Sequence, residues 1–539
     1  MKTIMNKRIT IFLSIFVLLS LFVKIHLGFD CDEQYAFSMM YRFTQGQRYI
    51  SDIFDPHQFS ALLTTPLFYL CSLLSKQYTV ILFRSFSAIL YFLGSIPVYL
   101  FIKKETNDKQ IAFLGLLSFF TLTPKSIISL EHSNLTVLFL TYVLMDCYTY
   151  LKYKEINIPL FSIKSVLLAI CYPTLILLLV PVLIIFISRK DYKSVIKFLV
   201  ICFLLALLLI IPPLINAGSF KELIKTVQTI TMDGSHQFSI TNRISVLFSD
   251  NKYALKYLAF YSVFFGGFVC WKHFSSNSWI SNAPNWILFC ASFFVAGIFQ
   301  VVFLIASPTA GYIRYTFLML IAIFVSVKRR EQALSRCLLV LLVAIAIMFL
   351  TTNNGIPSTA GFCAFSIMAI TLLYRSDRKG VSFLLLSIIL CQSFYYLFSY
   401  HVSGGGPRSV FHSDLVESKI IKEIMTEQVD ENYFESCASQ EVLSSSGKVM
   451  IGGKDSYSYL LVGGEVFAPS TISTPEFGEQ WKVYLQSENV KDFDLLIEKS
   501  YPGTDNLVNI IRKNYRLRLI CTIRKNGTAV PLHRCAVPL

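Results

Sequence analysis

Three carboxylates lie within four residues near the N-terminus, at Asp30, Asp32 and Glu33. They directly follow an apolar run, residues 9–27, that is long enough to span a membrane. Carboxylates are costly to place beside hydrocarbon, so acids kept at this position indicate a functional site. We interpret these three acids as the edge of a catalytic site. A helix cap with solvated loop acids is the simpler alternative, and the residues leave it open.

The segment after these acids is aromatic and basic, and it is joined at both ends to apolar runs, residues 9–27 and 78–102. Attachment at both ends suits a site that must be rigid. We expect a helix over residues 33–45, with Asp32 as its N-cap and Gly46 just past its end. A second short helix, residues 62–74, is expected to lie along the membrane surface.

The composition is that of an integral membrane protein, because 54% of the 539 residues are hydrophobic and only 15% are charged. The mean hydropathy is +0.57. The formal net charge of +15 comes from the first 400 residues, which carry 33 basic and 16 acidic side chains, whereas the remainder carries 15 and 17. Basic residues in the membrane part follow the loops expected to face the cytoplasm, so the charge does not indicate nucleic-acid binding.

About thirteen membrane spans are expected, with the N-terminus in the cytoplasm and the C-terminal end outside. The first apolar run is read as a retained helix, because no small-residue cleavage site follows it. Residues 159–188 are read as two short tilted helices, since Pro173 disfavours helical geometry in the residue before it. The expected spans are residues 9–27, 78–102, 111–127, 135–150, two within 159–188, 195–215, 254–271, 286–306, 312–327, 334–350, 357–374 and 381–400.

Two domains are expected: a membrane domain over residues 1–400, with outer loops 28–77 and 216–253, and an extracytoplasmic soluble domain over residues 401–539. Short apolar runs and glycine pairs predict a mixed α/β fold for the second. Of its three cysteines, Cys437, Cys521 and Cys535, two can pair in an oxidising compartment, and the sequence does not say which. No Cys/His spacing suggests a metal site, and His236 and His412 are read as ordinary surface residues.

Several short motifs occur here in a set order. They are Asp32-Glu33-x-Tyr35-Ala36, Gly46, Asp55-Pro56, a juxtamembrane helix, Arg84-Ser85-Phe86-Ser87-Ala88, Tyr99 and Lys103-Lys104. The order resembles that of the C-type (GT-C) glycosyltransferases, most closely the bacterial aminoarabinose transferases and protein O-mannosyltransferases. The resemblance covers the membrane half, most firmly residues 28–150. It departs from the family at His57-Gln58-Phe59-Ser60, where those enzymes carry a Lys-Pro element.

The resemblance implies an enzyme of the cytoplasmic membrane. Such enzymes move a sugar from a polyprenyl-phosphate donor to a lipid, glycan or protein acceptor on the outer face, with inversion at the anomeric carbon. It implies Asp32 as base and Glu33 as its neighbour. A departing phosphate requires nearby cations, and the candidates are Arg84, Arg314, His57 and Arg42, with Arg48 and Lys125 on the same side. Glu131 matches a second acid that binds the acceptor or a divalent cation, and the metal requirement stays open.

Two other functions are weighed against this one. A polysaccharide polymerase or ligase usually has a late outer loop rich in arginine, and residues 216–253 lack that pattern. A transporter or flippase of lipid-linked sugars predicts charges at mid-membrane and paired broken helices. Asp146 is the acid found inside an expected span, near its cytoplasmic end. The depth of the essential acid distinguishes transport from enzymatic transfer.

Overall fold

A computed structural model describes most of the chain. The described residues are 7–55, 57–123, 128–231, 240–274, 284–303, 308–351, 359–373, 377–400, 408–409, 414–416, 424–426, 447–453, 456–457, 459–460, 464–472, 478–487, 492–497, 504–513, 515–525 and 528–536. Two compact units divide the chain. The helical unit comprises Met1–Lys24, Ser87–Leu205 and Phe238–Tyr400. The mixed unit comprises Ile25–Phe86, Ala206–Gln237 and His401–Leu539.

Each of the thirteen expected spans contains a helix. These helices are α1 (Lys7–Ile25), α4 (Thr79–Thr106), α5 (Lys109–Phe120), α6 (His132–Tyr153), α7 (Ile158–Cys171), α8 (Leu179–Ser188), α9 (Tyr192–Ala217), α11 (Ile240–Phe274), α13 (Asn285–Val302), α14 (Pro308–Lys328), α15 (Gln332–Thr351), α17 (Phe365–Leu373) and α18 (Arg378–Phe398). Within the described ranges, seven are long and apolar enough to cross a membrane: α1, α4, α6, α9, α13, α15 and α18. The chain is therefore a multi-pass, mainly helical membrane protein.

The expected break near Pro173 is confirmed. Helix α7 ends at Cys171, a 3-10 turn covers Pro173–Leu178, and α8 continues from Leu179. Proline explains the break, because its ring crowds the preceding residue out of the helical region. Accordingly, Tyr172 has extended backbone angles. The run is thus split into two short helices instead of one long span.

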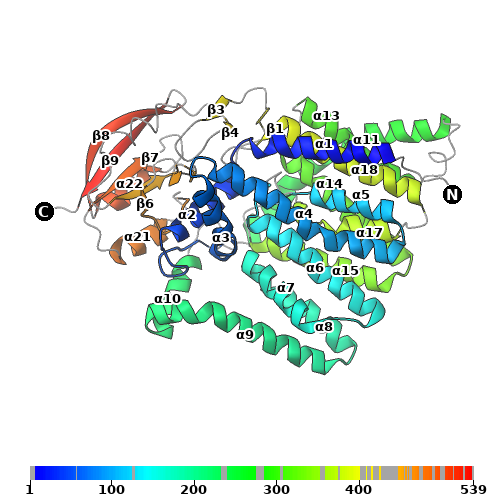
Figure 1. The fold of residues 1–539 in the computed structure, drawn as a ribbon, viewed down its shortest axis with the longest axis horizontal. Helices are drawn as coiled ribbons and strands as arrows, with labels where there is room; N and C mark the ends of the chain where they lie inside the picture. The colour runs from blue at the N-terminus through cyan, green and yellow to red at the C-terminus, as the bar shows by residue number, and fades with distance from the viewer. Residues whose placement is uncertain are drawn as a thin grey trace. The chain divides into compact units, whose positions relative to one another are not determined.

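Helices of the helical unit pack side by side, with α13 against α18, α18 against α5, and α6 against both α7 and α15 (Figure 1). Burial differs sharply between them: 78% of the most apolar stretch of α6 is buried, against 11% of that of α9. Small 3-10 turns, such as Ala360–Phe362, join the longer helices. A buried apolar helix lies inside a bundle, whereas an exposed apolar helix suits contact with lipid.

The first expected loop helix is confirmed in the mixed unit, with a different cap. Helix α2 spans Cys31–Thr44, and its N-cap is Asp30, whose carboxylate accepts the backbone N–H of Asp32 at 3.1 Å. The expectation that Asp32 is the cap was wrong by two residues, because the helix begins earlier than its apolar pattern indicates. Gly46 follows the end of the helix with φ +85°, as expected for a C-terminal glycine.

Two further helices of the mixed unit are α3 (Gln58–Leu74) and α10 (Phe220–Thr231). The second expected loop helix is confirmed as α3, which begins four residues before the predicted start, while its position along the membrane surface stays a prediction. The early start follows from Gln58, whose side chain accepts the backbone N–H of Ile50 at 2.6 Å and donates to the carbonyl of Asp55 at 2.9 Å. These bonds join the first turn of α3 to the loop before it.

The C-terminal segment forms the predicted mixed α/β fold. Its elements are β2 (Arg408–Ser409), β3 (Asp414–Val416), β4 (Ile424–Thr426), β5 (Lys448–Gly452), β6 (Glu465–Val466), α21 (Gly478–Ser487), β7 (Asp492–Ile497), α22 (Thr504–Arg512), β8 (Arg516–Lys525) and β9 (Thr528–Ala536); β1 (Ser399–Tyr400) precedes them. Five strands form one sheet in the order β6-β5-β7-β9-β8. β5 pairs in parallel with β6 and β7, whereas β9 pairs antiparallel with β7 and β8.

One apolar core in the mixed unit is shared by the N-terminal helices and the C-terminal sheet. Phe29 stacks on Tyr457 with 5.3 Å between ring centroids, and Phe54 meets Tyr484 edge-on at 6.0 Å. Backbone bonding joins the same segments, since the N–H of Phe54 donates to the carbonyl of Pro469 at 2.8 Å. Loop and sheet therefore fold against one another. The boundary expected at residue 401 stays a prediction about independent folding.

Several sequence-based interpretations fall outside the described residues or side chains. These concern Lys125, His236, residues 404–407, His412, Cys437 and the side chains of Cys521 and Cys535.

Candidate functional site

The three N-terminal acids have different environments on α2. Asp30 is 7% exposed and caps the helix, while Glu33 is 4% exposed. Asp32, in the first turn, is the half-buried member of the group. Backbone N–H groups at a helix start favour negative charge, so this turn is a suitable place for a carboxylate. Asp30 and Glu33 are therefore buried, whereas the side chain of Asp32 is partly exposed.

Glu33 and Arg84 form a buried two-pronged ion pair. The Nε of Arg84 donates to Oε1 of Glu33 at 2.9 Å, and its Nη2 donates to Oε2 at 2.6 Å. Arg84 also donates to the carbonyls of Ile25 and Gly28, and its guanidinium lies 5.1 Å from the ring centroid of Phe29. Planar, bidentate pairing of this kind gives strong orientation. The pair fixes α2 to the start of α4 and to the chain that precedes α2.

Arg42, near the end of α2, is completely buried. Its Nε donates to Oε1 of Gln47 at 2.6 Å, and its Nη2 donates to the carbonyl of Asp52 at 2.7 Å. A longer bond from Nη1 reaches the carbonyl of Pro469 at 3.4 Å. Arg42 therefore closes the loop after α2 and joins it to the C-terminal segment of the same unit.

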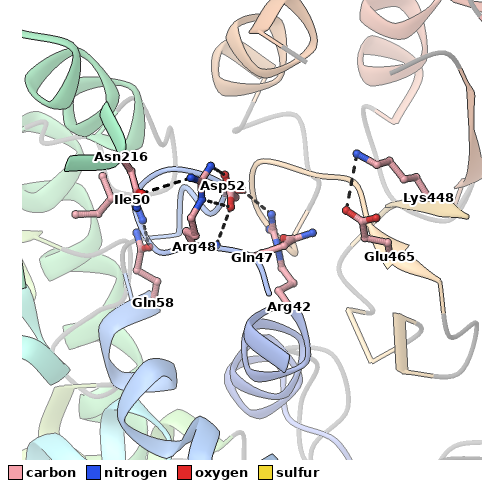
Figure 2. Close-up of polar contacts among 9 residues, drawn as sticks. All are labelled: Arg42, Gln47, Arg48, Ile50, Asp52, Gln58, Asn216, Lys448 and Glu465. Carbon is pink, nitrogen blue, oxygen red and sulfur yellow. Dashed lines mark hydrogen bonds and ion pairs between the residues drawn. The ribbon is translucent and has the colours of Figure 1, made fainter. Parts of the chain in front are cut away.

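Figure 2 shows how polar side chains hold this loop. Arg48 and Asp52, four residues apart, form an ion pair at 3.2 Å, and Arg48 also donates to the side chain of Asn216 at 3.4 Å. Ile50 has φ +64°, an unfavourable value for a β-branched residue. Its N–H is held by the side chain of Gln58. Specific bonds thus hold the loop at Arg48, Ile50 and Asp52.

Asp55 is fully buried where the loop meets the C-terminal segment. Its carboxylate accepts bonds from the hydroxyl of Ser470 and from the backbone N–H of Thr471, the latter at 3.4 Å. Burial raises the pKa of Asp55 to about 6, against the lowering effect of Arg42 and of these bonds. His57 follows, half-buried, with its ring edge-on to Tyr35 at 6.3 Å.

Glu131 and Arg314 belong to the helical unit. Glu131 is the N-cap of α6 and accepts the backbone N–H groups of Ser133 at 2.7 Å and Asn134 at 2.9 Å. Its carboxylate also lies 2.8 Å from Nδ1 of His132. Both carboxylate oxygens thus have bonding partners inside the protein, as is typical of a helix cap.

Arg314 is enclosed by neutral groups. Its Nη2 donates to Oε1 of Gln300 and to the hydroxyl of Tyr395, each at 3.0 Å, and its Nη1 contacts the sulfur of Cys391 at 2.6 Å. Gly297 gives the guanidinium its space, because a Cβ there would overlap Nη1 of Arg314.

The predicted site residues thus divide between the two units. Asp32, Glu33, Arg42, His57 and Arg84 lie in the mixed unit, where direct bonds bring Glu33 and Arg84 together. Glu131 and Arg314 lie in the helical unit. The catalytic and phosphate-binding roles assigned to these residues stay predictions.

Sequence reasoning gave no role to Asp55, although the Asp-Pro motif that contains it was noted. Its burial against Ser470 depends on a contact more than 400 residues away in the chain. Among the residues that the structure describes, no three His, Cys, Asp or Glu side chains gather as a metal site requires. The need for a divalent cation stays a prediction to be tested.

Comparison with known proteins gives little additional information. No protein-family model matches the chain, and a search of curated proteins found no match. Among solved structures, the crystal structure of ArnT from Cupriavidus metallidurans bound to undecaprenyl phosphate is similar, with 10% sequence identity over 98% of both chains and a TM-score of 0.39. Similarity at this level establishes neither a shared activity nor a shared ligand.

Proposed function

We propose that the chain is a membrane glycosyltransferase that moves a sugar from a polyprenyl-phosphate donor to an acceptor hydroxyl group, with Asp32 as the general base. The acceptor is a lipid, a glycan or a protein on the outer face of the cytoplasmic membrane. Direct attack on the anomeric carbon inverts its configuration, and the polyprenyl phosphate leaves. Asp32 takes the proton of the acceptor as the new glycosidic bond forms.

One observation carries this proposal: of three adjacent acids, Asp32 is the one that the fold leaves partly exposed. Asp30 serves as the helix cap and Glu33 is paired with Arg84, so both have clear structural roles. A general base must reach the proton that it abstracts, which a fully buried carboxylate cannot do without rearrangement.

The contacts around α2 support the same assignment. The ion pair between Glu33 and Arg84 anchors the first turn of α2, next to Asp32. The bonds of Arg42 anchor the last turn of the same helix. Between them, the hydroxyl of Ser38 donates to the carbonyl of Ser456 at 2.7 Å. A base on a rigid helix is already oriented before the substrate binds, so little conformational entropy is lost on binding. This favours catalysis.

The predicted cations differ in what they can offer a phosphate. Arg42, Arg84 and Arg314 are buried and donate to acceptors within the protein, so a phosphate must displace some of these bonds. His57 is half-buried and lies within the expected outer loop, residues 28–77. We therefore place His57 first among the four as a contact for the leaving phosphate, with the arginines holding the surrounding structure.

The decisive experiment uses purified protein in liposomes with a panel of radiolabelled prenyl-phosphate sugars and membrane lipids as acceptors. We expect Asp32→Asn to fold and insert but to lose transfer by roughly 10²–10⁴-fold, the usual contribution of a general base. Asp52→Asn is the matched control, because Asp52 is a second half-buried acid of the same segment and forms an ion pair with Arg48.

Normal transfer by Asp32→Asn would refute the assignment of the base. Equal losses in both variants would point to a general electrostatic effect of the segment. Downhill movement of the lipid-linked sugar across the bilayer, without formation of a glycosidic bond, would favour the transporter alternative.

A further inference from the structure

A cavity of about 620 Å³ lies in the helical unit among α11, α13 and α14, which pack against one another (Figure 1). It is lined near the C-terminal ends of α11 and α14 and the start of α13, as Phe265, Phe289 and Phe324 show. Its volume is within the usual range for ligand sites. None of the predicted catalytic residues lines it.

The walls of this cavity are aromatic and aliphatic. Phe265 and Phe289 meet edge-on with 5.1 Å between ring centroids, which gives the wall between α11 and α13 a fixed shape. Phe324, on α14, is 68% exposed and Ile321 is partly buried. Among the three helices, α13 is long and apolar enough to cross a membrane. An aromatic and aliphatic surface of this kind suits the acyl chain of a lipid.

Positive charge gathers at one end of the cavity. Lys328 and Arg329 line it from the end of α14, and Asn285 lines it from the start of α13. The ammonium of Lys272 donates to the side chain of Asn285 at 2.8 Å, which brings a third cation to the rim. No carboxylate is among the described residues that line the cavity.

The start of α13 adds to the attraction for an anion. Its N-cap is Pro284, whose side chain makes no capping bond. The first turn of a helix carries partial positive charge and N–H groups that favour phosphate. Lys328 and Arg329 lie at the C-terminal end of α14, where the dipole of that helix also favours positive charge. That dipole does not explain Lys272, which bonds to Asn285 at the start of α13.

We propose that this cavity binds one anionic glycerophospholipid of the cytoplasmic leaflet. The phosphate lies between Lys328 and Arg329 near the start of α13, and an acyl chain lies along Phe265 and Phe289. The leaflet follows from the charge rule, which places the loops after α11 and α14 in the cytoplasm. Basic pockets between helices on that side are suited to anionic headgroups. The proposal is independent of the sugar-transfer reaction.

Native mass spectrometry of the detergent-purified full chain tests the proposal, with phosphatidylglycerol and phosphatidylcholine of identical acyl chains as probes. We expect one phosphatidylglycerol retained per chain in preference to phosphatidylcholine. Lys328→Gln lowers that retention about fivefold, as expected for about 1 kcal/mol per basic residue near an anionic headgroup. Lys193→Gln is the matched control, because Lys193 is an exposed lysine at the start of another helix of the same unit.

A second variant, Ile321→Trp, fills the cavity without changing its charge. Because Ile321 is only partly buried, the change is tolerated, and retention of phosphatidylglycerol is lost. Persistent retention in Ile321→Trp would place the lipid on the basic surface instead of in the cavity. Equal retention of the two phospholipids, or equal losses in Lys328→Gln and Lys193→Gln, would overturn the proposal. Displacement by inorganic phosphate, or stronger retention of undecaprenyl phosphate, would overturn the assigned occupant.

Discussion

Arg84 in the mixed unit and Arg314 in the helical unit are both almost fully buried, at 2% and 1% exposure, but their charges are balanced differently. Arg84 is paired with the carboxylate of Glu33 and with two backbone carbonyls. Arg314 contacts an amide oxygen, a phenol and a sulfur, and no described carboxylate bonds to it.

This difference separates two ways of holding a buried cation. An ion pair removes net charge but leaves a second buried charge if one partner is lost. A set of neutral dipoles leaves the charge in place and depends on close packing, as the approach of Arg314 to Gly297 shows. Substitutions in the two units should therefore fail for different reasons and by different amounts.

The largest effect is expected from Arg84→Met. Removing the guanidinium takes both bonds of the ion pair from the buried Glu33 carboxylate, which costs about 3–5 kcal/mol. Arg314→Met takes a partner only from neutral polar groups, and Oε1 of Gln300 still accepts the bond from the hydroxyl of Tyr261 at 3.3 Å, so the cost is about 1–3 kcal/mol. Thermal unfolding of both variants in the same detergent measures the difference. The double variant Glu33→Leu with Arg84→Met should recover most of the loss. Equal destabilisation by the two single variants would break the comparison.

A second prediction concerns pH and the buried carboxyl of Asp55. Its pKa in the folded protein is about 6, above the usual value of 3.8, because burial disfavours the charged form. The folded state therefore binds this proton more tightly than the unfolded state, so the contribution of Asp55 to stability is greatest below about pH 4 and is lost as pH rises through 6. The difference of about two pH units corresponds to about 3 kcal/mol.

Unfolding midpoints of the full chain, measured from pH 4 to pH 8, test whether stability falls with rising pH as expected. Asp55→Asn cannot ionise and should show a flatter profile over that range, while its side-chain oxygen still accepts the bond from Ser470. An identical pH profile in Asp55→Asn would show that another group controls the change.

The third prediction tests the packing around Arg314. Gly297→Ala places a methyl group against the guanidinium and should cost about 1–3 kcal/mol through overpacking. Gly266→Ala, on α11, is the matched control, because a Cβ there meets no atom within 4 Å. Alanine favours a helix interior, so the control should gain up to about 1 kcal/mol. Similar shifts in unfolding temperature for both variants would show that space beside Gly297 is not limiting.

Much of the fold follows from local signals in the sequence. Apolar run lengths located the thirteen helical segments, and the break at Pro173 follows from proline geometry. The cap of α2 was missed by two residues because Asp30, Asp32 and Glu33 are all suitable at a helix start, and the choice among them depends on packing.

The candidate site was less predictable because its contacts are distant in sequence. The bond from Arg84 to Glu33, 51 residues earlier, was not predicted, and the phosphate-binding role of Arg84 stays a prediction. Burial of Asp55 depends on Ser470, 415 residues later. Periodicity carries no information about such pairs, since they form only when the mixed unit assembles its shared core.

The smallest effect is expected at the surface of the mixed unit, where Arg48 and Asp52 pair at 3.2 Å with 55% and 29% of their side chains exposed (Figure 2). Solvent screens this pair, so Arg48→Gln should cost less than about 1 kcal/mol, and the loss should shrink at high salt. Thermal unfolding at low and high ionic strength measures it. A loss as large as that of Arg84→Met, and insensitive to salt, would mean that the bond from Arg48 to Asn216 holds the loop more firmly than exposure indicates. Burial would then not determine how much a charged residue contributes to stability, even within the mixed unit.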